Sequence, residues 1–84
     1  MYTVYIIQSL KDQSYYVGMT SDLQERLSYH NQGKVTSTRN KIPWKVAYTE
    51  EFPTILEART RECYLKTAAG RRFRKKLWGH SSAG

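Results

Sequence analysis

The stretch YTVYIIQSLKDQSYYVGM, residues 2–19, determines the fold that we expect for this chain. Residues 2–10 are rich in β-branched and aromatic types, and Val4 and Ile6 alternate with their neighbours along the chain. A polar turn at 11–14 separates this run from a second short strand-like run at 15–19. Two such runs joined by a short polar turn predict a β-hairpin.

A helix is expected directly after the hairpin. Ser21 followed three residues later by Gln24 is a capping box, and Gly33 is a typical stop signal. Together they predict a helix over residues 22–31. Residues 34–43 are polar, basic and without periodicity, which indicates a loop.

The second half of the chain adds one strand and two helices. Residues 44–52 resemble a third strand. Thr54 with Glu57 forms another capping box and predicts a helix that runs to the residue before Gly70, where it stops. Residues 71–78 then form a final short basic helix. The sequence therefore predicts an α+β domain in which a small three-stranded, mostly antiparallel sheet is flanked by helices in the order β-β-α-β-α-α.

The length and composition limit the type of protein. Eighty-four residues suffice for one small domain, which we expect at 1–78 with a flexible tail at 79–84. A hydrophobic fraction of 39% suits a thin layered structure with an open active site, so no small-molecule cofactor is expected. No apolar run approaches the roughly 20 residues of a membrane span, and the N-terminus lacks the pattern of a signal peptide. The single cysteine fits a reducing compartment, so we expect a cytoplasmic protein that does not bind membranes.

The charge is strongly positive, with a net charge of +7 and a pI of about 9.8. Such a balance favours association with polyanions. Eight of the basic residues lie between Arg59 and Lys76, where Glu62 is the only acid. This run can be a solvated helical face that keeps a small protein soluble, or a surface that binds nucleic acid.

Glu62 occupies an unusual position in the predicted second helix. Ala58, Leu65 and Ala69 mark one apolar stripe at helical spacing, and Glu62 falls inside it. A carboxylate on the inner face of a helix costs free energy unless it is paired or holds a metal. An ion pair, for instance with Arg26, and a metal site are therefore both open interpretations.

Two further groups of residues could carry chemistry. Arg26 and His30 are four residues apart in the first helix, so both can clamp one phosphate, or both can be ordinary surface residues. Most hairpin tyrosines are expected to pack, but cross-strand pairing can bring Tyr5 and Tyr16 together on one face. If Arg26 and Glu62 reach that face, a polar cluster forms on an open sheet. The sequence has no zinc-ligand spacing, no phosphate-binding glycine loop and no nucleophile elbow.

These residues make the sequence resemble the GIY-YIG nuclease superfamily over about residues 2–78. The small size further resembles stand-alone bacterial members of the YhbQ-like, UPF0213 type. The chain departs from the family pattern at Met19, where several relatives have a lysine, and at Arg74, where some have an asparagine. The two half-motifs appear as Thr3-Val4-Tyr5 and Tyr16-Val17-Gly18. Arg26 and His30 match the two family positions of the first helix. Glu62 matches the metal-binding glutamate, and Lys66 matches the basic residue one turn beyond it.

The resemblance implies a GIY-YIG fold and hydrolysis of a phosphodiester bond with one Mg²⁺ or Mn²⁺ on Glu62. Arg26 would stabilise the pentacovalent phosphorane. Tyr5 would accept the proton of the attacking water, and Tyr16 would orient that water or share the role. His30 would hydrogen-bond the phosphate or assist proton transfer. The residues expected to bind backbone phosphates are Lys66, Arg71, Arg72, Arg74, Lys75 and Lys76.

The function expected from this resemblance is a largely non-specific, metal-dependent DNA endonuclease of DNA repair or processing. The alternative hypothesis is a non-catalytic DNA- or RNA-binding module that uses the basic C-terminal helix. The two differ in whether Glu62 or the basic run determines the phenotype.

Overall fold

The three strands form one antiparallel sheet in the order β2-β1-β3. The computed structural model describes the backbone of residues 1–83 and the side chains of residues 1–76. The predicted α+β class and the order β-β-α-β-α-α are confirmed. The elements are β1 (Tyr2–Ser9), β2 (Tyr15–Thr20), α1 (Leu23–Asn31), a short 3-10 turn η1 (Arg39–Lys41) within the predicted loop, β3 (Trp44–Phe52), α2 (Ile55–Leu65) and α3 (Ala68–Ala83).

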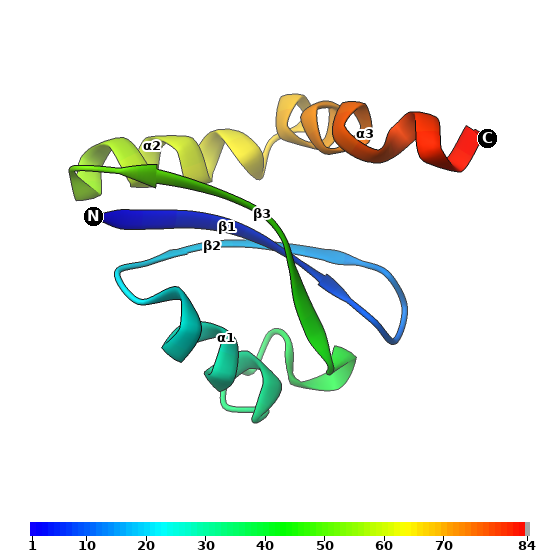
Figure 1. Cartoon of the computed structure of the whole chain (residues 1–84), viewed down its shortest axis with the longest axis horizontal. Helices are drawn as coiled ribbons and strands as arrows, with labels where there is room; N and C mark the ends of the chain where they lie inside the picture. Colours follow the sequence, from blue (N-terminus) through cyan, green and yellow to red (C-terminus); the bar gives the residue numbers. More distant parts are fainter. Residues whose placement is uncertain (84) are drawn as a thin grey trace.

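The sheet lies between two helical layers (Figure 1). Helices α2 and α3 lie on one face, and α1 with the segment that follows it lies on the other. Because successive side chains of a strand point to opposite faces, the middle strand β1 contributes to two separate cores. Val4 and Ile6 pack toward α2, whereas Tyr5 and Ile7 pack toward α1. All four are at most 1% exposed, since β1 is covered on both faces.

The ends of α1 are set by local hydrogen bonds. The sequence predicted Ser21 as the N-cap, which is wrong: the carboxylate of Asp22 accepts the backbone N–H of Glu25 at 3.1 Å. Aspartate caps a helix as well as serine does, and Asp22 is the residue that immediately precedes the first turn. Gly33, with φ of +78°, follows the C-terminal end of α1 as predicted, because its backbone conformation favours glycine.

The boundary between α2 and α3 differs from the prediction. Thr54 caps α2 as expected, accepting the N–H of Glu57 at 3.2 Å, but the helix ends at Leu65. Gly70 does not interrupt a helix: it is buried within α3, and an added Cβ there would overlap the carbonyl group of Leu65. The glycine therefore permits a close approach between the two helices. The break falls instead before Thr67, whose hydroxyl accepts the N–H of Gly70 at 3.3 Å.

The C-terminal end is only partly described. Helix α3 is assigned as far as Ala83, and Gly84 lies outside the described residues. The domain boundary at 78 and the flexible tail at 79–84 therefore stay predictions. Within the part of the chain that the structure describes, no helix is both long and apolar enough to span a bilayer.

Candidate active site

Tyr5 and Tyr16 lie on the same face of the sheet, the face that α1 covers. In the β1–β2 pairing, Tyr5 is opposite Gly18 and Tyr16 is opposite Ile7, so the two tyrosines are diagonal neighbours. The phenol of Tyr5 lies across Gly18: a Cβ built at Gly18 would be 2.5 Å from the Tyr5 hydroxyl oxygen. Gly18 is therefore the residue that leaves room for the Tyr5 ring. Tyr5 is 1% exposed, whereas Tyr16 is half-buried.

His30 of α1 is fully buried against these two tyrosines. Its Nε2 is 3.0 Å from the Tyr5 hydroxyl oxygen, and its ring centroid is 5.1 Å from that of Tyr16 in an edge-on arrangement. Its Nδ1 is 2.8 Å from the hydroxyl oxygen of Thr38. Burial lowers the pKa of His30 to about 4, and the positive charge of Arg26 adds to the effect. The imidazole is therefore neutral at neutral pH.

Arg26 lies one turn before His30 on α1 and is half-buried. Its Nε is buried and has no hydrogen-bond acceptor among the described residues. Because a buried donor without a partner is costly, this N–H is available to an anion such as a phosphate oxygen. Burial raises the pKa of Tyr5, and Tyr16 and Glu62 raise it further, whereas the nearby guanidinium of Arg26 opposes this change. Arg26 therefore lies close to the Tyr5 hydroxyl, as the sequence hypothesis required.

Glu62 lies on α2, in the helical layer on the other face of the sheet. Its side chain on α2 is 15% exposed, and its carboxylate is 3.0 Å from the Lys66 ammonium and 4.0 Å from the Arg59 guanidinium. The ion pair suggested by the sequence is thus present, but its partners are Lys66 and Arg59 instead of Arg26. The negative charge of Glu62 is the smallest of the effects that raise the pKa of Tyr5.

The carboxylate of Glu62 suits a divalent cation that keeps most of its water. No group of three or more His, Cys, Asp or Glu side chains that could hold a metal occurs among the described residues. Mg²⁺ in phosphoryl-transfer sites is commonly held by one or two carboxylates and by oxygens of the substrate. A single half-buried carboxylate fits that pattern, and the cation would compete there with Lys66.

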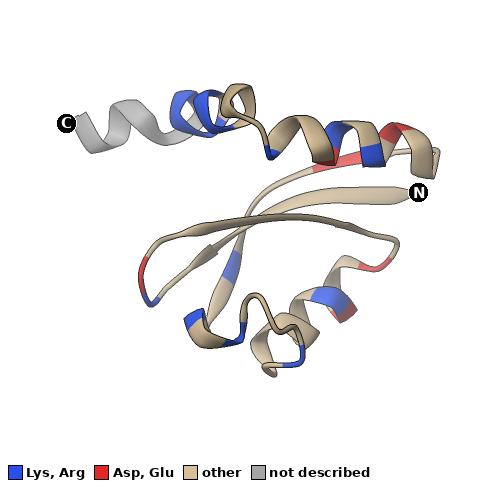
Figure 2. Ribbon diagram, turned by 180° about the vertical axis from the view of Figure 1, so that it is seen from behind, with Lys and Arg blue, Asp and Glu red and all other residues tan. Residues whose placement is uncertain are grey.

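The basic residues of α3 do not all face solvent. Arg71, Arg72, Lys75 and Lys76 are exposed, and they form a positive surface at the start of α3 (Figure 2). Arg74 has a structural contact instead: its guanidinium donates to the carbonyl oxygen of Leu65 at 3.1 Å and lies 5.5 Å from the centre of the Tyr15 ring. Burial lowers its pKa. Arg74 therefore links α3 to the end of α2 and to the edge strand.

A second positive surface lies in the layer of α1, on the opposite face of the sheet (Figure 2). It is formed by the exposed Lys and Arg side chains of the segment from Lys34 to Lys45. Lys41 is 3.5 Å from Asp12, while Lys34 lies over the ring of Tyr29. The sequence identified this segment only as a basic loop. Its proximity to His30 depends on the tertiary fold and could not be inferred from local composition.

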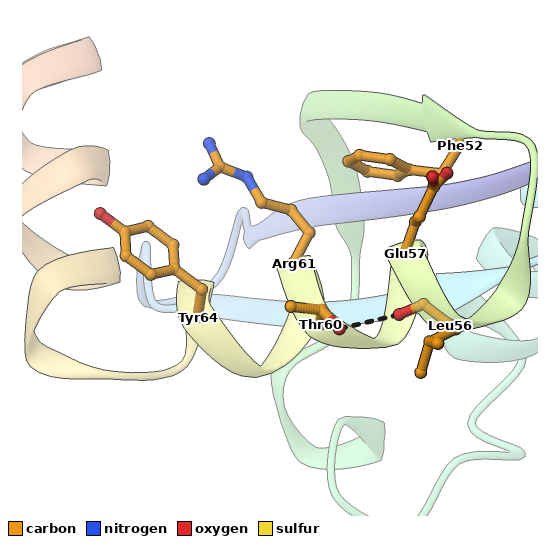
Figure 3. Close-up of a pocket in the computed structure, with 6 residues that line it drawn as sticks. All are labelled: Phe52, Leu56, Glu57, Thr60, Arg61 and Tyr64. Atoms are coloured by element: carbon orange, nitrogen blue, oxygen red, sulfur yellow. Dashed lines mark hydrogen bonds between the residues drawn. The ribbon is translucent and has the colours of Figure 1, made fainter.

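A separate pocket of about 540 Å³ lies along the outer side of α2 (Figure 3). Leu56, Thr60 and Tyr64 follow one stripe of the helix. Arg61 is bound through a bidentate ion pair to Glu50 of β3, with nitrogen–oxygen distances of 2.8 and 3.1 Å. None of the site residues described above lines this pocket. It is therefore distinct from the cluster around Tyr5.

The sequence matches the family described as the GIY-YIG catalytic domain over residues 1–76. It is 39% identical over 64 residues to the UPF0213 protein of Streptococcus pneumoniae, a match that covers 75% of this chain and 64% of that protein. It is 42% identical over 64 residues to UPF0213 protein CPE1444 of Clostridium perfringens, with 75% and 68% covered. The matches thus span about two thirds of the length of these relatives.

The fold also matches a solved structure, the solution NMR structure of the UPF0213 protein BH0048 from Bacillus halodurans. The TM-score is 0.56 and the identity is 33%, and the match covers 92% of this chain and 83% of that one. The resemblance inferred from the two half-motifs is confirmed by both the sequence and the structure matches.

Proposed function

The chain belongs to the GIY-YIG catalytic domain family, which consists of endonucleases, and from this premise we propose that it is a divalent-metal-dependent DNA endonuclease of DNA repair or processing. One observation carries the proposal: the Tyr5 hydroxyl is hydrogen-bonded to buried His30 at 3.0 Å, and the charges of Arg26 and Glu62 both affect the pKa of Tyr5. The proposal thus combines a neutral imidazole and a cationic donor near the phenol with a carboxylate in the other helical layer. These are the groups that phosphodiester hydrolysis requires.

Arg26 is proposed to bind the scissile phosphate. Its guanidinium keeps its charge at any physiological pH and offers planar, forked donors that match two phosphate oxygens. The buried Nε–H that lacks an acceptor can form such a bond at little additional cost, since it has already lost its hydration. As charge accumulates on the phosphoryl oxygens, the same contact strengthens, which lowers the barrier.

The two tyrosines are proposed to differ in role according to their exposure. Half-buried Tyr16 orients the attacking water at the surface, and Tyr5 accepts its proton. Because the pKa of Tyr5 is raised, a free phenolate is disfavoured in the resting protein. Tyr5 therefore passes its own proton to Nε2 of His30 as it receives the proton of water. His30 contacts the Tyr5 hydroxyl through Nε2, so in the proposed reaction it acts through Tyr5.

A Mg²⁺ or Mn²⁺ held by Glu62 would supply Lewis-acid stabilisation of charge on the phosphate and the leaving oxygen. Lys66 holds the Glu62 carboxylate in place through its 3.0 Å contact. Once the carboxylate is otherwise engaged, the Lys66 ammonium becomes free to bind a backbone phosphate.

The proposed substrate is DNA bound without reading its sequence. The exposed Lys and Arg side chains of α3 can contact phosphates, and phosphate contacts carry little sequence information. These residues are Arg71, Arg72, Lys75 and Lys76. We therefore expect DNA binding with low sequence specificity. Arg74 is excluded from this set since its guanidinium is bound to Leu65.

A nicking assay on supercoiled plasmid DNA with Mg²⁺ or Mn²⁺ tests the proposal. We expect wild-type protein to convert supercoiled DNA to the open circular form, and Glu62→Ala and Arg26→Ala to be slower by about 100-fold or more. Glu57→Ala is the matched control, because Glu57 is an exposed carboxylate on the same helix. Absence of cleavage by wild type, or cleavage by Glu62→Ala at the wild-type rate, contradicts the proposal.

A non-catalytic DNA- or RNA-binding module is the second candidate, favoured by the exposure of the α3 bases. It expects that Glu62→Ala leaves binding and phenotype unchanged, whereas reversal of Arg71, Arg72 and Lys75 to Glu abolishes both. A salt titration measures the effect, since each lost phosphate contact lowers the slope of log affinity against log salt by roughly one. Unchanged affinity after the reversals would rule this candidate out.

A further inference from the structure

Thr38 is a polar residue in a fully buried position beside the site. It lies between α1 and β3, just before η1, and is 0% exposed. Its hydroxyl oxygen is 2.8 Å from Nδ1 of His30 and 3.4 Å from the carbonyl oxygen of Val35. His30 in turn contacts the Tyr5 hydroxyl through Nε2. A continuous line of hydrogen bonds thus runs from Val35 through Thr38 and His30 to Tyr5.

We propose that Thr38 is a positioning residue that holds His30 in the tautomer protonated at Nδ1, so that Nε2 accepts the hydrogen bond of the Tyr5 hydroxyl. A neutral imidazole has one N–H donor and one acceptor nitrogen, and the hydrogen bond at one nitrogen decides the role of the other. The direction of the Tyr5–His30 bond is therefore set at the far side of the ring.

The carbonyl of Val35 fixes the direction at one end of the line. In the proposed arrangement the Thr38 hydroxyl donates to this carbonyl, which can only accept, and offers a lone pair to His30. The Nδ1 of His30 must then carry the proton that it donates to Thr38. Nε2 is left as the acceptor.

Arg26 fixes the direction at the other end. Its guanidinium is near enough to oppose the rise in the Tyr5 pKa and can only donate, so in the proposed arrangement the Tyr5 oxygen accepts on that side. Within the described residues, the Tyr5 proton then has Nε2 of His30 as its acceptor. The reverse direction would leave a buried hydroxyl proton without an acceptor, which costs about 1–3 kcal/mol. Both ends of the line therefore require the same tautomer.

The backbone around Thr38 is held firmly enough to perform this task. The indole N–H of Trp44, which is 4% exposed, donates to the Thr38 carbonyl oxygen at 3.0 Å, and the backbone N–H of Lys41 donates to the same oxygen at 3.1 Å. The N–H of Thr38 donates to Val35 at 3.1 Å. These bonds tie the segment to the buried start of β3. The loop predicted from its lack of periodicity is thus a rigid support for His30.

The catalytic consequence rests on the proposed nuclease function, whereas the tautomer itself does not. With Nε2 unprotonated, the Tyr5 proton points to His30 and the lone pairs of the phenol point away from it. That is the orientation in which Tyr5 can accept a proton from water and release its own. In the opposite tautomer the Nε2–H would occupy a lone pair of Tyr5 and block this transfer.

The tautomer is measured directly from the ¹⁵N chemical shifts of the His30 ring in two-bond ¹H–¹⁵N correlation spectra at neutral pH. The chain has two histidines, so a His80→Gln background leaves a single imidazole to assign. We expect a protonated Nδ1 and an unprotonated Nε2 in this background and in Thr38→Ser. Thr38→Val, which keeps the shape but removes the hydroxyl, leaves Nδ1–H without its acceptor, a cost similar to that of an unpaired Tyr5 proton, so the ring should become a mixture of the two tautomers. Thr36→Val is the matched control, because Thr36 lies in the same loop but is exposed.

The nicking rate gives the second readout. Thr38→Val should lower it by roughly 10- to 100-fold, the range typical of lost partners that orient a histidine ring, while Thr38→Ser and Thr36→Val keep it within about twofold. A protonated Nε2 in the unmodified ring, or an unchanged tautomer in Thr38→Val, overturns the inference whether or not the protein cleaves DNA. A protein with the expected tautomer that cleaves no DNA refutes the nuclease proposal alone, so the two failures are distinguishable.

Discussion

Replacing Gly18 with alanine should damage the site through a single steric conflict. The new Cβ would lie 2.5 Å from the hydroxyl oxygen and 2.6 Å from Cζ of Tyr5. Ordinary contacts between such atoms are about 3.5–4.0 Å, so the ring must move by roughly 1 Å. Tyr5 is 1% exposed and packed among core residues, so this movement cannot be absorbed by solvent. Overpacking of this kind typically costs about 1–3 kcal/mol.

The same movement should break the 3.0 Å hydrogen bond between Tyr5 and His30. A destabilisation of 1–3 kcal/mol lowers the melting temperature of a domain of this size by roughly 4–8 °C per kcal/mol. Thermal melts followed by circular dichroism measure that loss. At a temperature where the variant stays folded, its nicking rate should still fall by about tenfold or more, because the loss of a catalytic hydrogen bond adds to the loss of stability.

Two controls separate the steric conflict from the general cost of replacing a glycine. Gly33→Ala introduces strain at a positive φ, but its Cβ would meet Ile42 at an ordinary 3.6 Å, so it should lower stability without lowering the rate per folded molecule. In Tyr5→Phe the bond to His30 is already absent, so adding Gly18→Ala should cost less than the sum of the two changes by about 0.5–1.5 kcal/mol. Wild-type stability and activity in Gly18→Ala, or full additivity with Tyr5→Phe, would refute the assigned role of Gly18.

Three further predictions concern the surrounding structure. The pKa of His30 is about 4 in the folded protein and 6.5 in the unfolded chain. The free energy of unfolding should therefore keep its full value above pH 6.5 and fall by up to roughly 3 kcal/mol as the pH drops to 4. Melting curves of His30→Asn should lack this component, and identical pH profiles would disprove it. Gly70→Ala should cost at least about 3 kcal/mol in urea denaturation because its Cβ would overlap the backbone of Leu65, and a cost below 1 kcal/mol would contradict that contact. Reversal of Lys34 and Arg39 to Glu should reduce the salt slope of plasmid binding by about two if the α1-side surface contacts DNA, and an unchanged slope would exclude that surface.

The elements were predictable because their signals are local. The alternation of Val4 to Ile7 and the capping pair at Thr54 act over one strand or one helical turn, and both gave correct elements. Gly70 shows the limit of such signals. A glycine indicates equally a chain break or a close approach, and only the position of Leu65 in space decides between them. Asp22 in place of Ser21 is a smaller case, since two adjacent residues had nearly equal capping strength.

The sequence proposed the members of the candidate site, but it did not indicate how they contact one another. Spacing placed Arg26 and His30 on one side of α1, yet the burial of His30 depends on Thr38 and on Trp44 from a distant strand. No periodicity in the loop identified Thr38, because Thr38 lies outside any regular element and its partner His30 is eight residues away. Arg74 looked like one more phosphate-binding base, although its contact with the end of α2 exists only after the helices pack. Long-range contacts of this kind carry no signature in a single sequence.

The layering of the sheet limits where a phosphate could be bound in the proposed reaction. Arg26 belongs to the layer of α1 and Glu62 to the layer of α2, on opposite faces, yet both charges act on Tyr5. A ligand that meets both must therefore pass round an edge of the sheet. The Tyr5 hydroxyl lies over Gly18 of β2, and β2 is an edge strand that contacts α2 as well. The edge formed by β2 is thus the shorter way for a ligand to contact both layers. Because the sheet is thin and ends at this strand, groups from the two layers can act on one phosphate without an enclosed cleft.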